Sequence, residues 1–210
     1  MILGSNLQRA LLVVLIALLA AVAAVLLTGK QVHSSVASTT SGSRFDGPTM
    51  PPGLHAANFV LTDQFGHRVS LSAYRGQVVV LTFIHSLCHD ACPFMVEQIK
   101  GALNDLPDAG RNVPAIGVTV APSEDTPANR RRFLSMHEMD GRLAFVNGPL
   151  QHVRALWRAY AIQPGTTPEG HSAFVLLIDK RGIERVGFAA DQLTPEGLAH
   201  DIGVLEREPA

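Results

Sequence analysis

Residues 78–99 read VVVLTFIHSLCHDACPFMVEQI, and this stretch decides the fold of the chain. It opens with an unbroken apolar run, Val78–Ile84, of the kind that forms a central strand buried on both faces. After a short polar loop, apolar residues recur at helical spacing, and Pro93 suits the first turn of that helix. The sequence therefore predicts a strand, a loop and an amphipathic helix, with both cysteines of the chain, Cys88 and Cys92, at the junction.

The remainder of the folded part is predicted to alternate strands and helices. Expected strands cover residues 58–63, 67–71, 114–120, 143–146, 173–178 and 183–188. Expected helices cover residues 126–139 and 149–160, followed by a last helix that Thr194 caps with Pro195 at its first position. The first two strands flank Gly66 and form an N-terminal β-hairpin. This order describes a three-layer α/β domain, and the place of the cysteine pair makes it thioredoxin-like by analogy.

Length and charge narrow the classes of function. The chain has 210 residues, which is enough for one domain with a substantial core once the N-terminal segment is set aside. Its formal net charge is −1 and its charged residues are scattered, so nothing favours binding to nucleic acid. Two cysteines are too few for a framework of disulfides, which makes a function of the pair itself the better interpretation.

An apolar segment near the N-terminus predicts a membrane anchor. Ala10–Leu27 holds no charge and no proline, and its 18 residues just reach the length of a membrane-spanning helix. Arg9 before it and Lys30 after it give a weak bias that places the N-terminus in the cytoplasm. We therefore expect residues 1–30 to form a single-pass anchor in the inner (plasma) membrane, with the domain on the periplasmic, extracytoplasmic side. A cleaved signal peptide is the alternative, and it predicts the same compartment.

A linker is predicted between the anchor and the domain. Residues 31–53 are rich in Ser, Thr, Gly and Pro and nearly free of large apolar side chains, as flexible linkers are. The folded domain is accordingly expected over residues 54–210.

The two cysteines form a C-x-x-x-C motif with His89, Asp90 and Ala91 between them. At the start of a helix, Cys88 and Cys92 can approach each other, and the helix dipole favours thiolate over thiol. Two neighbouring thiolates suit Cu(I), Zn²⁺ or a reversible disulfide. Two buried apolar cysteines with no chemical role are the remaining interpretation.

A metal held by two thiolates needs a further ligand, and the chain has nine histidines. His171 lies between a Gly/Pro-rich loop, residues 163–170, and the next predicted strand. In a thioredoxin-like sheet that strand begins beside the cysteine motif, so His171 is the candidate third ligand. His85, His89 and Asp90 are local to the motif and are candidates for contacts that support the ligands.

Four stretches of the chain together resemble one family. They are LTFIHSLCHDACP (81–93), GHSAFVLLIDKRG (170–182), FVLTDQFGHRVSLSAYRGQVVVLTF (59–83) and APSEDTPANRRRFL (121–134). These stretches are similar to the cysteine motif, the D-H-S segment, the entry hairpin and the D-P-x-x-D-T-P segment of the Sco (SenC) copper chaperones. The resemblance runs in colinear order over residues 54–205.

This resemblance implies a thioredoxin fold that binds one copper ion, as Cu(I) or Cu(II). It implies delivery of that copper to the dinuclear copper centre of cytochrome c oxidase subunit II, or to another copper-receiving client. Carried over, Cys88 and Cys92 match the thiolate ligands, which also form a disulfide when oxidised, and His171 matches the imidazole ligand. Such a chaperone makes and breaks no bond in a substrate, so the expected protein is not an enzyme.

Three positions depart from the pattern of the family. His89 stands in place of the first proline of the cysteine motif, Gly170 in place of the Asp before the ligand histidine, and Ala121 in place of the Asp that opens the D-P-x-x-D-T-P segment. None of these changes removes a ligand, but all three lie near the expected site, where they bear on copper affinity or on the choice of client.

An enzyme remains the alternative, as a membrane-anchored thiol–disulfide oxidoreductase that acts on client cysteines through a mixed disulfide. His171 separates the two hypotheses, because a metal site needs it and dithiol exchange does not. A peroxidase is less favoured, because no T-x-x-C motif precedes Cys88. An anchored structural domain with an incidental disulfide is the fourth interpretation.

Overall fold

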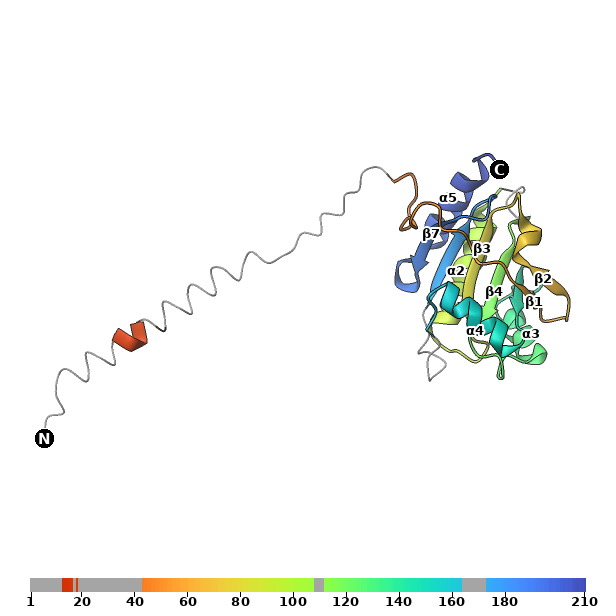
Figure 1. Ribbon diagram of the computed structural model, residues 1–210, viewed down its shortest axis with the longest axis horizontal. Coiled ribbons are helices and arrows are strands. Elements are labelled where there is room, and N and C mark those ends of the chain that lie inside the picture. Colours follow the sequence, from red (N-terminus) through yellow and green to blue (C-terminus); the bar gives the residue numbers. More distant parts are fainter. Residues whose placement is uncertain (1–12, 17, 19–42, 108–111, 164–172) are drawn as a thin grey trace, which may run out of the picture. The chain divides into compact units, whose positions relative to one another are not determined.

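The computed structural model describes residues 13–16, 18, 43–107, 112–163 and 173–210 (Figure 1). The chain divides into two units, Met1–Gly42 and Ser43–Ala210, and the second unit carries the fold described below. Among the described residues, no helix is long and apolar enough to cross a membrane. Most of the predicted anchor lies outside them, so the anchor stays a prediction.

A five-stranded sheet forms the middle of the second unit, in the order β5-β4-β3-β6-β7. The strands are β3 (Val79–Ile84), β4 (Ala115–Thr119), β5 (Leu143–Val146), β6 (Phe174–Ile178) and β7 (Glu184–Ala189). Strand β4 runs parallel to β3 and β5, whereas β6 is antiparallel to β3 and β7. Every residue of β3 is buried, which confirms the central strand that its apolar run predicts.

Helices cover one face of the sheet, and a helix with a hairpin covers the other (Figure 1). The first face holds α2 (Ala91–Asp105), α3 (Pro127–Met136) and α5 (Pro195–Glu206). The second holds α4 (Leu150–Ala159) and the hairpin of β1 (Val60–Thr62) and β2 (Arg68–Ser70). The described part of this unit also includes the short 3₁₀ turns η2 (Leu71–Tyr74) and η4 (Ala190–Gln192). The predicted three-layer α/β domain with an N-terminal hairpin is confirmed.

Threonine caps begin two of the helices. Thr126 Oγ1 accepts a hydrogen bond from Asn129 N before α3, and Thr194 Oγ1 accepts one from Gly197 N before α5. A proline follows each cap at the first helical position, as the sequence predicts. Helix α3 ends at Met136, earlier than expected, because the chain turns through a left-handed conformation at Glu138, where φ is 55°.

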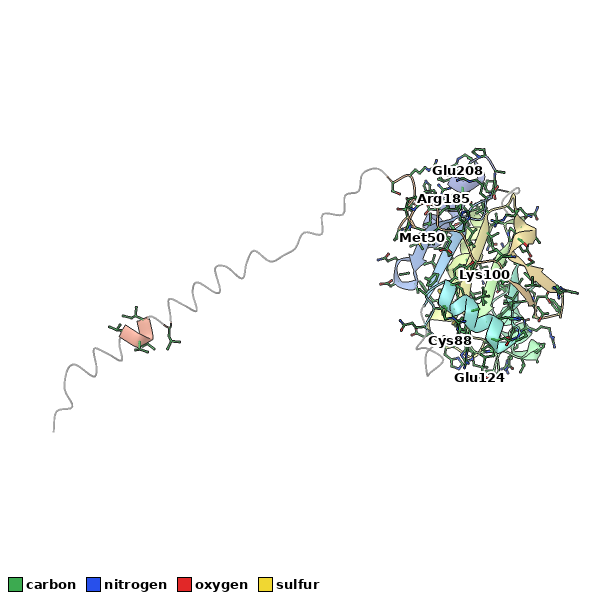
Figure 2. The ribbon with its side chains drawn as sticks, viewed as in Figure 1. Met50, Cys88, Lys100, Glu124, Arg185 and Glu208 are labelled. Carbon is green, nitrogen blue, oxygen red and sulfur yellow. The ribbon has the colours of Figure 1, made fainter. Side chains whose placement is uncertain are left out.

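The predicted linker is shorter at its C-terminal end than the composition indicates, because the chain packs on the domain from Ser43 onward. Residues 48–50 lie along the edge strand β7, where Met50 N donates to Arg185 O and Gly187 N donates to Pro48 O, each at 2.9 Å. Figure 2 shows Met50 and Arg185 in the upper part of the domain. The expected boundary at residue 54 is therefore wrong, since backbone pairing at a sheet edge needs no apolar side chain.

Asp201 of α5 holds the start of this segment. It is fully buried, and its carboxylate accepts from Asp46 N at 2.8 Å, from Gly47 N at 2.9 Å and from the His200 ring at 2.9 Å. Each carboxylate oxygen thus receives a backbone N–H from a segment more than 150 residues earlier in the chain.

We expect Asp201→Ala to lower the free energy of unfolding by about 3 kcal/mol, because two buried backbone donors lose charged acceptors. Urea unfolding of the full chain, followed by the fluorescence of its single tryptophan, Trp157, measures this loss. Asp191→Ala, at an exposed acid in η4, is the matched control and should change stability by less than about 0.5 kcal/mol. Equal losses in the two variants would contradict the anchoring role.

Glu184 is an acid that the fold buries at the beginning of β7. Its side chain has no hydrogen-bond or ion-pair partner among the described residues, and desolvation by burial raises its pKa from 4.5 to about 7. It lines a cavity of about 700 Å³ together with residues of the Ser43–Gly53 segment, among them Met50. Its burial is not predicted by the sequence, and other acids share this property, among them Asp125 and Asp201.

The raised pKa predicts a pH dependence of stability. Between about pH 4.5 and 7 the folded chain keeps a proton on Glu184 that the unfolded chain has released, so stability falls as the pH rises through this interval. Glu184→Gln should remove that fall, and relative to the original chain it should gain about 1 kcal/mol between pH 5 and pH 8. Urea unfolding at both pH values measures the gain. Glu196→Gln, at an exposed acid, is the control and should show no gain. If the stability of Glu184→Gln changed with pH in parallel with that of the original chain, the raised pKa of Glu184 would be refuted.

Candidate metal centre

The cysteine loop leaves the sheet at the end of β3 and leads into α2. A turn follows Ile84, in which Cys88 N donates to His85 O at 3.2 Å, and α2 begins at Ala91 with Cys92 in its first turn. Both cysteines are buried, with exposed fractions of 3% for Cys88 and 0% for Cys92. Figure 2 shows Cys88 at the lower end of the domain, away from Met50 and Arg185.

The two thiols lie together. Cys92 is hydrogen-bonded to Cys88, and its Sγ also accepts from His85 N at 3.3 Å. The bond with Cys88 and the burial raise the pKa of Cys92, and they outweigh the opposite effect of the His85 amide. For Cys92, the predicted preference for thiolate at the start of the helix is therefore wrong, because the hydrogen bond with Cys88 and the desolvation by burial both disfavour its thiolate.

Asp125 holds the cysteine loop in place. This buried carboxylate accepts from Ser86 N at 2.8 Å, from Ser86 Oγ at 2.6 Å and from Thr119 Oγ1. Burial raises its pKa in spite of these bonds. Asp125 is not among the site residues that the sequence predicts. Its signal was present in the SEDTP part of residues 121–134, within a stretch that carries the family resemblance.

His85 follows β3 directly and points away from solvent. Only 2% of the residue is exposed, and its Nε2 lies 3.3 Å from Glu124 Oε2 and 4.0 Å from Asp125 Oδ1. Although the Glu124 oxygen is near, it lies outside hydrogen-bonding direction, so Nε2 is buried without a hydrogen bond within the described part of the chain. The expectation that His85 supports the cysteine site is consistent with its amide contact to Cys92.

The remaining predicted residues differ in where they lie. His89 and Asp90 are exposed on the loop between the cysteines, and the Asp90 side chain makes no capping bond to α2. His171 lies outside the described residues. The strand that follows it in the chain, β6, begins at Phe174 beside the end of β3, where Thr82 Oγ1 donates to Phe174 O at 2.9 Å.

Comparison with known proteins assigns the family. The profile of SCO1/SenC matches residues 48–205. The chain belongs to the SCO1/SenC family. Among solved structures, ScoI of Bradyrhizobium japonicum with copper bound superposes with a TM-score of 0.62 at 26% identity, over 72% of this chain and 99% of that one. Apo Sco1 of Thermus thermophilus superposes with a TM-score of 0.64 at 23% identity, over 77% and 96%.

These structural likenesses confirm the thioredoxin-like Sco fold with its mixed sheet. Among curated relatives, mitochondrial SCO1 of Saccharomyces cerevisiae is 24% identical over 65% of this SCO1/SenC chain and 50% of its own length. Chloroplastic peroxiredoxin Q of Oryza sativa subsp. japonica is 30% identical over 72% of this chain. The chain spans 64% of the length of that peroxiredoxin.

Loss of the Asp125 carboxylate is expected to loosen the cysteine loop. Asp125→Ala leaves three donors without their acceptor, so we expect a loss of about 3 kcal/mol in stability and a rise of about tenfold in the rate at which iodoacetamide alkylates the two thiols. Mass spectrometry of the full chain under native conditions measures this rate. Asp140→Ala, at an exposed acid, should leave it unchanged, and an equally unchanged rate in Asp125→Ala would show that the carboxylate does not order the loop.

Proposed function

We propose that this SCO1/SenC protein is a copper-binding chaperone whose ion is held by Cys88, Cys92 and His171. The observation that carries the proposal is the pair of hydrogen-bonded, buried thiols at the start of α2. Two sulfurs that are already hydrogen-bonded to each other can bind the same ion with little movement of the backbone. The copper-bound ScoI of Bradyrhizobium japonicum, which shares the fold, supports copper as the ion.

The donor set fits copper. Two thiolates and one imidazole are soft to borderline ligands, which favour Cu(I) over Mg²⁺ or Ca²⁺ and also tolerate Cu(II). His171 is supported by its place in the sequence three residues before Phe174, at the strand end that lies beside β3. Because the pKa of Cys92 is raised, uptake of the ion is coupled to release of the thiol proton.

Delivery would pass the ion to a client that carries its own Cys and His donors. The dinuclear copper centre of cytochrome c oxidase subunit II is the client that we propose, supported by the similar protein whose structure is described as a member of the Sco family of cytochrome c oxidase assembly proteins. Leu87 and Phe94 are 40% and 45% exposed beside the buried cysteines, and they offer an apolar contact surface to such a client. Residues 1–30 are proposed to tether the domain on the periplasmic side of the membrane.

A thiol–disulfide oxidoreductase is the second candidate, favoured by the contact between the two thiols and by the likeness to peroxiredoxin Q. In this reaction the thiolate of one cysteine attacks a client disulfide, and the second cysteine releases the reduced client as the chain's own disulfide forms. The raised pKa of Cys92 makes it a poor first nucleophile, so Cys88 would attack.

Titration of Cu(I) into the reduced full chain, against a chromophoric chelator, tests the proposal. We expect one tightly bound equivalent. Cys88→Ser and His171→Ala should each weaken binding more than about 100-fold, because loss of a ligand exceeds the 10- to 100-fold effect of losing an outer partner. His152→Ala, on α4, is the control and should bind as the original chain does.

The same preparations separate the two candidates. Binding that is indifferent to His171 would overturn the proposed site. If that result came with reduction of a disulfide-bonded peptide that survives His171→Ala and is lost in Cys88→Ser, the oxidoreductase would take its place.

A further inference from the structure

The imidazole of His85 is a buried donor that the cysteine site does not use. The residue is 98% buried, yet its Nε2 makes no hydrogen bond in the described part of the chain. A buried polar atom without a hydrogen bond costs about 1–3 kcal/mol, so such atoms are rare in folded proteins and call for a ligand or a function. The nitrogen faces the start of the segment before α3, where Glu124 and Asp125 lie.

The distance to Glu124 matches that between two ligands of one ion. Nε2 of His85 and Oε2 of Glu124 are 3.3 Å apart. Two donor atoms that each lie about 2.0–2.1 Å from a cation are about 3.3 Å apart when they subtend a tetrahedral angle. In that arrangement the ion lies on the lone-pair axis of His85 Nε2, and Oε2 of Glu124 lies off this axis. The oxygen does lie outside hydrogen-bonding direction.

Asp125 is not counted among the ligands. Its oxygens accept from Ser86 N, Ser86 Oγ and Thr119 Oγ1, and Oδ1 is 4.0 Å from Nε2 of His85. The Glu124 side chain, by contrast, is 55% exposed, so it can adjust its position and leaves the ion open to water on the outer side. Water molecules would complete the coordination.

We propose that His85 and Glu124 form a second cation site, for a divalent ion that accepts imidazole and carboxylate together, such as Cu²⁺ or Zn²⁺. This site is distinct from the cysteine pair and goes beyond the proposed chaperone function. It lies next to that pair, because the amide of His85 itself contacts Cys92 Sγ. The chain thus places a nitrogen and oxygen site, suited to Cu(II), against a sulfur site suited to Cu(I).

A second cluster of similar composition shows why it matters that His85 Nε2 makes no hydrogen bond in the described part of the chain. Asp46, His200 and Asp201 also bring potential ligand atoms within 4.8 Å of one another. There the Asp201 oxygens already accept backbone N–H groups, and the His200 ring is hydrogen-bonded to Asp201. The polar atoms of that cluster are already hydrogen-bonded and hold two segments of the chain together, so the cluster serves as the internal control.

The test uses the full chain with Cys88→Ala, Cys92→Ala and His171→Ala together, so that the thiol site is absent. Cu²⁺ alone is titrated at pH 7.5 and followed by calorimetry and by electron paramagnetic resonance, with circular dichroism to confirm the fold. We expect one equivalent whose spectrum shows a single nitrogen ligand with oxygen ligands. In this background His85→Phe, which keeps a ring of similar size, should weaken binding at least about tenfold. Zn²⁺ should compete for the same equivalent.

Two further variants keep the result decisive if His85→Phe disturbs the fold. Glu124→Gln changes an exposed side chain and should weaken binding several-fold, whereas His200→Phe should leave it unchanged. Affinity that is indifferent to both His85→Phe and Glu124→Gln, or that is lost in His200→Phe, would overturn the proposal. Because this background holds no cysteine, its outcome is independent of Cu(I) binding by the original chain, which tests the chaperone function.

Discussion

The complete burial of β3 is the constraint on which the rest of the structure depends. All six residues of this strand are buried, with apolar residues from both layers packed against its two faces. A strand enclosed in this way cannot present reactive groups along its length, so chemistry becomes accessible only where the strand ends. The cysteine loop occupies that end, and the neighbouring strands bring the 119–126 segment and the start of β6 to the same place.

Burial also sets the chemistry of the thiols. Cys88 and Cys92 share a hydrogen bond in a site from which water is largely excluded, and this environment holds Cys92 as a neutral thiol. A metal ion changes the balance, because its charge stabilises the thiolates that the protein interior disfavours. In the proposed copper site, the same pair would therefore stay protonated at Cys92 without an ion and would release that proton when an ion binds.

Polar contacts between distant segments hold this arrangement. Asp125 fixes the turn after β3 from 39 residues away, and Asp201 fixes the Ser43–Gly53 segment from more than 150 residues away. The two carboxylates play comparable roles, since each is buried and each accepts hydrogen bonds from another part of the chain. Asp125 orders the loop of the candidate metal centre, and Asp201 fixes the segment that pairs with the edge strand β7.

Local patterns in the sequence determined the strands and helices, the threonine caps and the position of the cysteine pair at the start of α2. These features depend on neighbours within a few residues, and hydrophobic period, capping residues and proline report such neighbours directly. Tertiary structure alone decided that Met50 pairs with β7, that Glu184 is buried with no partner among the described residues, and that His85 meets Glu124. It also reversed the expected acidity of Cys92, because a pKa depends on burial and on the nearest charges and donors, and the folded chain assembles these from segments that no local pattern connects.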